Sequence, residues 1–165
     1  MATEKLGLLR IISGGQTGAD QGALLAARKL GIPTGGTAPQ GWWTEKGCEE
    51  QMLREFGLIE CATPGYEART RQNVLDSDGT LIVGDDATGG TALTVTVAKH
   101  SGKPLFHVPN WLSFVPERAA EFREWLKDHE IQTLNVAGNR ESQHGGIENF
   151  TMKWLVLALG GGSNR

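Results

Sequence analysis

Residues 8–30 read LLRIISGGQTGADQGALLAARKL. The segment 8–13 is short, mostly apolar and bounded by glycines, which predicts a buried strand. Apolar residues at helical spacing over 20–30 predict a helix, and Gly31 and Pro33 would end it. A glycine-rich turn joins the two segments. A buried strand that passes through such a turn into a helix is the repeating unit of α/β proteins with a parallel sheet.

The same alternation continues along the rest of the chain. Further short apolar segments predict strands at residues 33–37, 58–61, 80–83, 105–108 and 133–137. Helices are predicted between and after them, at residues 49–56, 66–75, 91–100, 116–129 and 147–159. Neither a linker nor a repeat divides this pattern. It predicts a single α/β domain over residues 1–159, a three-layer sandwich with a mostly parallel sheet and helices on both faces, followed by a flexible tail at 160–165.

Composition and charge exclude several classes of partner. The 165 residues carry 16 Lys and Arg against 19 Asp and Glu, a net charge of −3, and contain no basic run. We therefore expect neither nucleic acid nor a membrane surface as a partner. The two cysteines, Cys48 and Cys61, make neither a disulfide framework nor a zinc site. We therefore expect no metal site in the protein itself. Residues 1–5 show no signal-peptide pattern, so we expect a cytoplasmic protein.

Glycine is the exceptional residue of this composition. The chain has 23 glycines among 165 residues, about 14%, which is roughly twice the usual share. Ligands of parallel α/β sheets bind at the carboxyl ends of the strands, so the strand-to-helix loops are the places to look for a site. Glycines in such loops let the backbone approach a ligand closely.

The first of these loops is SGGQTGAD at residues 13–20. Its glycines and the free N–H groups of the following helix start suit a phosphate, and Gln16 and Thr17 add side-chain donors. The alternative is a tight turn in which Asp20 caps the helix. The second loop, residues 84–91, ends in Gly89-Gly90-Thr91. It is a second candidate for anion binding, unless Thr91 is only an N-cap. Two such loops at one sheet edge favour a shared ligand site.

Two further segments carry polar residues with more than one interpretation. Tyr66, Arg69 and Asn73 share a face of the helix at 66–75, but their spacing alone favours a solvated face followed by turn-forming Asp76 and Asp78. The loop after the last strand, NVAGNRES at 135–142, combines a glycine with amide, guanidinium, carboxylate and hydroxyl groups. It is either a functional loop or a surface loop with an Arg–Glu pair.

Trp42 and Trp43 lie in a glycine-flanked loop. They could stack on a planar ligand or form a subunit interface. The four histidines are scattered and have no metal-binding spacing.

Five segments occur together in one order, SGGQTGAD (13–20), GG with PQG (35–41), RTRQN with DSDGT (69–80), GGT (89–91) and NVAGNRES (135–142). Over about residues 9–159 they resemble the "putative molybdenum carrier" family, the circularly permuted YpsA branch of the SLOG superfamily. The resemblance implies a Rossmann-like fold that binds nucleotide-derived ligands and forms homo-oligomers. It also implies the molybdenum cofactor, a phosphorylated pterin that holds the metal, as the cofactor.

The function implied is therefore carriage or sensing of a small phosphorylated nucleotide-derived or pterin ligand. The residues expected to contact that ligand are Gly14, Gly15, Gln16, Thr17, Gly18, Asp20, Arg69, Asn73, Asp78, Gly89, Gly90, Thr91, Asn135, Gly138, Arg140, Glu141 and Ser142.

A second function is implied by more distant relatives, the phosphoribohydrolases that cleave the base from a nucleoside monophosphate. Those enzymes carry a Gly-Gly-x-Gly-Thr-x-x-Glu motif. This chain has Gly89-Gly-Thr-Ala-Leu-Thr94, which lacks the inner glycine and has Thr94 where the glutamate is expected. An N-glycoside hydrolase thus stays the alternative rather than the expectation. Its acid would have to come from elsewhere, with Glu141 as the candidate catalytic residue.

Overall fold

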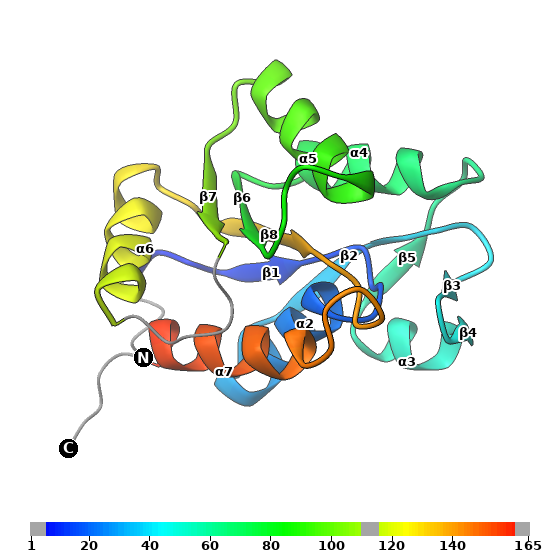
Figure 1. Cartoon of the computed structure of the whole chain (residues 1–165), viewed down its shortest axis with the longest axis horizontal. Helices are drawn as coiled ribbons and strands as arrows, with labels where there is room; N and C mark the ends of the chain where they lie inside the picture. Colours follow the sequence, from blue (N-terminus) through cyan, green and yellow to red (C-terminus); the bar gives the residue numbers. More distant parts are fainter. Residues whose placement is uncertain (1–5, 110–115, 161–165) are drawn as a thin grey trace.

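Six strands form one sheet in which all neighbouring strands are parallel (Figure 1). The computed structural model describes residues 6–109 and 116–160. All six predicted strands are present and the parallel sheet is confirmed. Across the sheet their order is β5 (Leu58–Glu60), β2 (Thr34–Ala38), β1 (Arg10–Ile12), β8 (Thr133–Gly138), β6 (Gly79–Val83) and β7 (Leu105–Val108).

Helices cover both faces of this sheet, which confirms the single-domain, three-layer Rossmann-like sandwich (Figure 1). The helices α4 and α5 pack together on one face, while α2 and α7 pack together on the other. Beside α7 lies α6, and α3 lies under β5. Their bounds are α2 (Ala19–Leu30), α3 (Glu50–Glu55), α4 (Tyr66–Leu75), α5 (Gly89–His100), α6 (Pro116–Asp128) and α7 (Ile147–Leu159).

The two neighbouring tryptophans have different environments, and neither faces a ligand cavity. Trp42 is buried in a small core with Leu24 of α2 and Leu53 of α3. Trp43 begins the hairpin of β3 (Trp43–Thr44) and β4 (Gly47–Cys48) and is 54% exposed. The sequence did not predict this hairpin, because two-residue strands have no periodicity. The burial of Trp42 excludes it as a stacking or interface residue, whereas Trp43 stays available for an interface.

The last strand in the sequence lies in the middle of the sheet. β8 pairs with β1 on one side and with β6 on the other. If β8 is counted as strand 1, the other five strands become 2 to 6 in chain order (β1, β2, β5, β6, β7). The sheet order then reads 4-3-2-1-5-6. Successive strands thus run outward from β8 first in one direction and then in the other, as they do in a doubly wound sheet. The order reverses between β8 and β6, where such sheets bind ligands.

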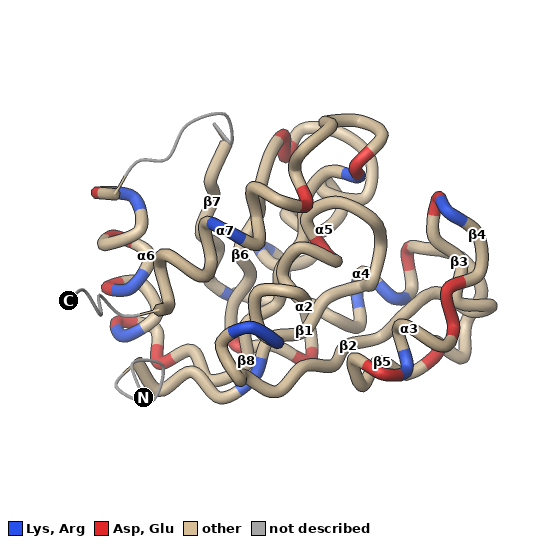
Figure 2. Tube along the Cα trace, turned by 90° about the horizontal axis from the view of Figure 1, so that it is seen from below, with Lys and Arg blue, Asp and Glu red and all other residues tan. Residues whose placement is uncertain are grey.

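Charges of both signs are interspersed along the described trace (Figure 2). Basic and acidic residues alternate along α6, and acidic residues gather on and beside α3. None of the helices within residues 6–109 and 116–160 is long and apolar enough to cross a membrane. Apart from Gly160, the predicted tail at 160–165 lies outside the described residues.

Candidate functional site

A cavity of about 410 Å³ opens at the carboxyl ends of β8 and β6. This volume suits a small-molecule ligand. Its walls come from the loop before α2, the first turns of α4 and α5, and the loop after β8. The structure therefore brings together residues that are far apart in the sequence. Eight of the predicted site residues line this cavity, namely Gln16, Asp20, Arg69, Gly89, Gly90, Thr91, Gly138 and Arg140.

The loop between β1 and α2 contributes side chains rather than free backbone donors. The N–H of Gln16 donates to Oδ2 of Asp20 (3.1 Å), and the N–H of Thr17 donates to Oε1 of Gln16 (3.0 Å). The N–H of Ala19 donates to the carbonyl of Asn139 (3.1 Å). These groups, which were expected to cradle a phosphate, are already hydrogen-bonded within the protein. Asp20 partly has the capping role considered as the alternative, because its carboxylate holds the turn together.

Helix α5 begins with free donors. The first hydrogen bond of this helix is from the N–H of Ala92 to the carbonyl of Thr88 (3.2 Å). Thr88 occupies the N-cap position and makes no side-chain capping bond, so Thr91 is not the N-cap. A Cβ atom at Gly89 or Gly90 would meet nothing within 4 Å. The helix start is thus open to the cavity, as an anion requires.

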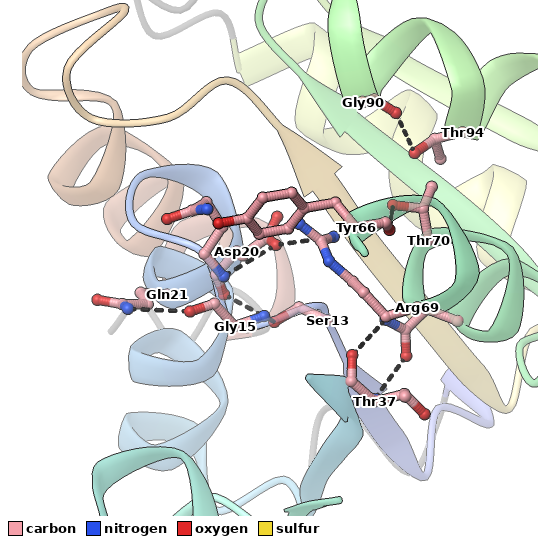
Figure 3. A network of polar contacts seen from close by, with 12 residues as sticks. Ser13, Gly15, Asp20, Gln21, Thr37, Tyr66, Arg69, Thr70, Gly90 and Thr94 are labelled. Atoms are coloured by element: carbon pink, nitrogen blue, oxygen red, sulfur yellow. Dashed lines mark hydrogen bonds and ion pairs between the residues drawn. The ribbon is translucent and has the colours of Figure 1, made fainter. Parts of the chain in front are cut away.

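Two arginines, Arg69 and Arg140, form another wall of the cavity together with Tyr66. Figure 3 shows Arg69 and Tyr66 beside Asp20. The guanidinium of Arg69, on α4, lies 3.8 Å from the Asp20 carboxylate. Arg69 and Arg140 both lie near the ring of Tyr66, with their guanidinium carbons 5.6 and 5.4 Å from its centroid. The side chain of Arg69 is only 13% exposed. The solvated helix face favoured by spacing alone is therefore wrong for Arg69.

Burial sets the charge state of this wall. Desolvation raises the pKa of Asp20 to about 6, although Arg69, the N–H of Gln16 and Arg140 oppose the rise. Desolvation also lowers the pKa of Arg69, against the attraction of Asp20. At neutral pH Asp20 is mostly ionised and balances the charge of Arg69, while Arg140 interacts with the carboxylate of Glu45.

The Gln16 amide is oriented by its oxygen. Oε1 accepts from the N–H of Thr17 (3.0 Å) and from the N–H of Glu45 (2.8 Å). Nε2, on the other side of the amide, is buried and has no hydrogen-bond partner within the described chain. Nε of Arg69 is also buried and unpartnered there. Buried donors without partners are rare, and both belong to residues that line the cavity.

Glu45 was not predicted, and it joins three segments beside the site. Its carboxylate accepts from the hydroxyl of Thr17 and, at 2.5 Å, from the hydroxyl of Ser142. It also accepts from the N–H of Ser142 (3.0 Å). Partial desolvation opposes ionisation, but the bonds from Ser142 and Thr17 prevail and lower the pKa of Glu45. An isolated glutamate in an irregular loop carries no sequence pattern that would have identified it.

Several residues that were predicted to contact the ligand do not line this cavity and make structural contacts. The Asn73 amide bonds both the N–H and the carbonyl of Thr37 (2.8 and 3.0 Å), which ties α4 to β2. The Asn135 amide donates to the Thr80 hydroxyl (3.3 Å), which joins β8 to β6. Gly18 has φ +84° and packs so closely on the backbone of Asn139 that a Cβ would clash. Gly14, Gly15 and Thr17 likewise support the cavity without lining it.

Asp78 lies at the wrong edge of the sheet. It precedes β6, and its Oδ2 accepts from the N–H groups of Gln132 and Thr133 (3.0 and 2.8 Å), just before and at the start of β8. These are the amino ends of the strands, opposite the cavity. Its predicted role in reading a ligand is therefore wrong. Two acceptor bonds to backbone explain the residue as a link between segments.

Glu141 caps a helix and does not line the cavity. Its two carboxylate oxygens accept from the N–H of Gly146 (2.5 Å) and the N–H of Glu148 (3.0 Å) at the start of α7. Ser142 is engaged with Glu45, as described above. The hydroxyl of Thr94, where the hydrolases have glutamate, donates to the carbonyl of Gly90 (2.9 Å). The position of Glu141 removes the support for it as the catalytic acid.

The described residues were also compared with the requirements of a metal site. Within residues 6–109 and 116–160, no three His, Cys, Asp or Glu side chains are grouped to hold a metal ion. The cavity wall itself contains no cysteine, histidine or methionine among the described residues. Soft metal ligands are therefore missing from it, and its chemistry is that of guanidinium, amide, hydroxyl and carboxylate groups.

The fold and the cavity define the class: a Rossmann-like α/β protein with a polar cleft at the point where its strand order reverses. The chain belongs to the circularly permutated YpsA SLOG family, whose model matches residues 11–159.

A solved structure supports this assignment. It is the crystal structure of a "putative molybdenum carrier protein" from Syntrophus aciditrophicus SB, which is 40% identical to this chain. The match covers 93% of this chain and 96% of the other, with a TM-score of 0.86. A comparison with curated proteins finds no match.

Proposed function

We propose that this protein binds a small phosphorylated ligand, derived from a nucleotide or a pterin, and acts as a carrier or sensor of it. The observation that carries the proposal is the convergence of Arg140, Arg69 and the open start of α5 on one cavity. The N–H groups of Gly89, Gly90 and Thr91 would hold the phosphate together with Arg140, because a helix start and a guanidinium both favour anions.

Titration calorimetry tests this proposal directly. We expect ribose 5-phosphate and nucleoside monophosphates to bind, and Arg140→Met to weaken them by about 10- to 100-fold, as the loss of a charged hydrogen bond predicts. Arg71→Met is the matched control, because Arg71 is exposed on α4 and does not line the cavity. The absence of binding by every phosphorylated compound, or equal losses in both variants, would contradict the proposal.

The molybdenum cofactor is the more specific candidate. The solved relative is named as a molybdenum carrier, and the unpartnered Gln16 and Arg69 donors fit the polar edge of a pterin. Arg140 and the start of α5 would hold its phosphate. Because the described cavity wall offers no soft ligand, the metal would stay on the pterin. Protein purified from a molybdenum-replete host should then contain molybdenum and pterin fluorescence, and protein from a depleted host should contain neither.

N-glycoside hydrolysis of a nucleoside monophosphate is the second candidate, and one observation favours it. Asp20 is a buried carboxyl on the cavity wall with a pKa of about 6, which suits a general acid or base. Asp20, rather than Glu141, would then be the catalytic acid or base of the hydrolase. Chromatography of incubations with nucleoside monophosphates should detect free base, which Asp20→Asn should abolish and Glu141→Gln should not. If no base is released, this candidate is rejected for the substrates used.

We also propose a homo-oligomer in the cytoplasm. Support for association comes from two exposed apolar residues near one edge of the sheet, Trp43 (54% exposed) and Ile59 of β5 (65% exposed). The proposed location in the cytoplasm is supported by the two cysteines, which are free thiols, as is usual in a reducing compartment. Sedimentation of the wild type and of Trp43→Ser tests the interface. An unchanged monomeric mass for both would contradict it.

A further inference from the structure

Gln16, Asp20 and Arg69 are the most buried amide and charged side chains on the cavity wall, and together they are called its inner end. We infer that this inner end selects ligands whose ring carries an oxo-lactam edge, a carbonyl beside a ring N–H, over rings with an amidine edge. Hypoxanthine and guanine have the first kind of edge, and adenine has the second. The inference rests on the proposed function, since it concerns the part of the ligand farthest from the phosphate.

The two unpartnered donors require an acceptor with two lone pairs. Gln16 is 5% exposed, and its Nε2 has no partner in the described chain. Nε of Arg69 is also buried and has no hydrogen-bond partner in the described chain. Leaving such donors unsatisfied is unfavourable, so a bound ligand should satisfy both. A carbonyl oxygen has two lone pairs and can accept from both groups, whereas adenine has at that position an amino group, which is itself a donor and can accept from neither.

The carboxylate beside these donors requires a donor in turn. The Asp20 side chain is 6% exposed and lies 3.8 Å from the Arg69 guanidinium. The carboxylate accepts from the N–H groups of Gln16 and Gly14, and because its two oxygens have about four lone-pair sites, acceptor capacity remains. A ring N–H adjacent to the carbonyl would supply the missing donor. An adenine ring nitrogen offers a lone pair at that position instead, which an ionised carboxylate repels.

The local charge argues against a phosphate at this end. Asp20 and Arg69 neutralise each other, and Arg140 interacts with Glu45, whereas the start of α5 keeps N–H donors that have no partner in the described chain. A phosphate therefore prefers the outer part of the cavity, and a neutral ring fits the inner end. The other titratable or charged groups that face Asp20 are Arg140 and Tyr66, with Glu67 exposed farther along the wall.

Inosine and adenosine monophosphate are a matched pair for the test, since they differ only at the lactam or amidine edge. We expect calorimetry at pH 7.5 to give about 10- to 100-fold tighter binding of the inosine nucleotide, the factor for one unsatisfied buried group. Equal affinities, or tighter binding of the adenosine nucleotide, would overturn the inference. Ribose 5-phosphate separates the two proposals: if it and both nucleotides bind equally, the phosphate site stands and the inner-end selectivity fails. If none of them binds, both fail.

Asp20→Asn should reduce the preference to within about threefold, because an amide can donate to the adenine ring nitrogen. Asp78→Asn is the matched control, since Asp78 lies at the opposite sheet edge, and it should leave the preference unchanged.

Should Asp20→Asn fail to fold, the pH dependence of binding supplies the same test on the wild type. Only about one-tenth of a carboxyl with a pKa of about 6 is ionised at pH 5. The ratio of the two affinities should therefore fall about tenfold from pH 7.5 to pH 5. A ratio that does not change with pH would overturn the inference.

Discussion

The guanidinium of Arg69 lies directly against the backbone of Gly14, where a Cβ atom would overlap Nη1 and Cζ. Arg69 approaches from α4 on one side of the sheet, and Gly14 follows β1. The absence of a side chain at position 14 thus lets Arg69 lie flat beside Asp20 at 3.8 Å. One glycine of the first loop therefore positions an arginine, rather than a phosphate.

Gly14→Ala should displace the side chain of Arg69 from the inner end of the cavity without unfolding the protein. The flexible end of a side chain is what would have to move, so we expect the free energy of unfolding to fall by only about 1 kcal/mol. The affinity for nucleoside monophosphates should fall by about tenfold or more. Calorimetry and urea unfolding measure the two effects. Gly145→Ala is the control, because a Cβ there would meet nothing within 4 Å, and it should change neither quantity.

Asp20 should make the stability of the protein depend on pH. Burial raises its pKa from 3.8 to about 6, so the folded state binds the proton more tightly than the unfolded state. Its contribution is therefore most favourable below about pH 4 and is lost as pH rises to about 6 and beyond. The total change is on the order of a few kcal/mol, because each unit of pKa shift changes the free energy of unfolding by about 1 kcal/mol.

Urea unfolding of the wild type and Asp20→Asn from pH 4 to pH 8 isolates this effect. The stability of the variant relative to the wild type should rise between pH 4 and pH 6 and then stay level. A difference that is constant over the whole range would show that Asp20 has an ordinary pKa.

Glu45→Ala should loosen the loop after β8 without unfolding the domain. The carboxylate accepts bonds from the N–H and the hydroxyl of Ser142 and from the hydroxyl of Thr17. Without it, the amide of Ser142 should exchange with solvent at least about tenfold faster, while the global free energy of unfolding changes by about 1 kcal/mol or less. Hydrogen exchange monitored by NMR measures both. Glu117→Ala, an exposed residue at the start of α6, should leave the Ser142 exchange rate as it is.

Glu141→Ala should lower stability and leave ligand affinity nearly unchanged. Its carboxylate satisfies two N–H groups at the start of α7, and the loss of a helix cap costs about 1 to 2 kcal/mol. Thermal unfolding measures the stability, and calorimetry with a nucleoside monophosphate measures the affinity. A large loss of affinity with unchanged stability would instead return Glu141 to the binding site.

Most of the fold could be predicted because its strands and helices carry strong patterns. β6 is apolar and fully buried, and α6 has buried Ala119, Phe122 and Leu126 on one stripe. The sheet edge at which the cavity lies followed from the parallel topology. The order of the strands did not, since the position of β8 between β1 and β6 depends on contacts between distant segments.

The roles of individual site residues were harder to predict, and the reason is geometric. Arg69 is polar and lies on a mostly polar helix, so only the packing of α4 over the loop at Gly14 shows that it is buried. Asn73, Asp78 and Glu141 have the chemistry of ligand contacts, yet each satisfies backbone groups of a neighbouring segment. Residue type indicates what a side chain can bond, whereas its partner depends on tertiary contacts.

The insertion of β8 between β1 and β6 has a consequence for folding. Before residues 133–138 are in place, β1 with β2 and β5, and β6 with β7, are two half-sheets whose inner edges are unpaired. We expect these edges to be the aggregation-prone surfaces of a folding intermediate. One event, the docking of β8, then removes both edges and brings Gly138 and Arg140 to the cavity. Completion of the sheet and formation of the binding site are the same step.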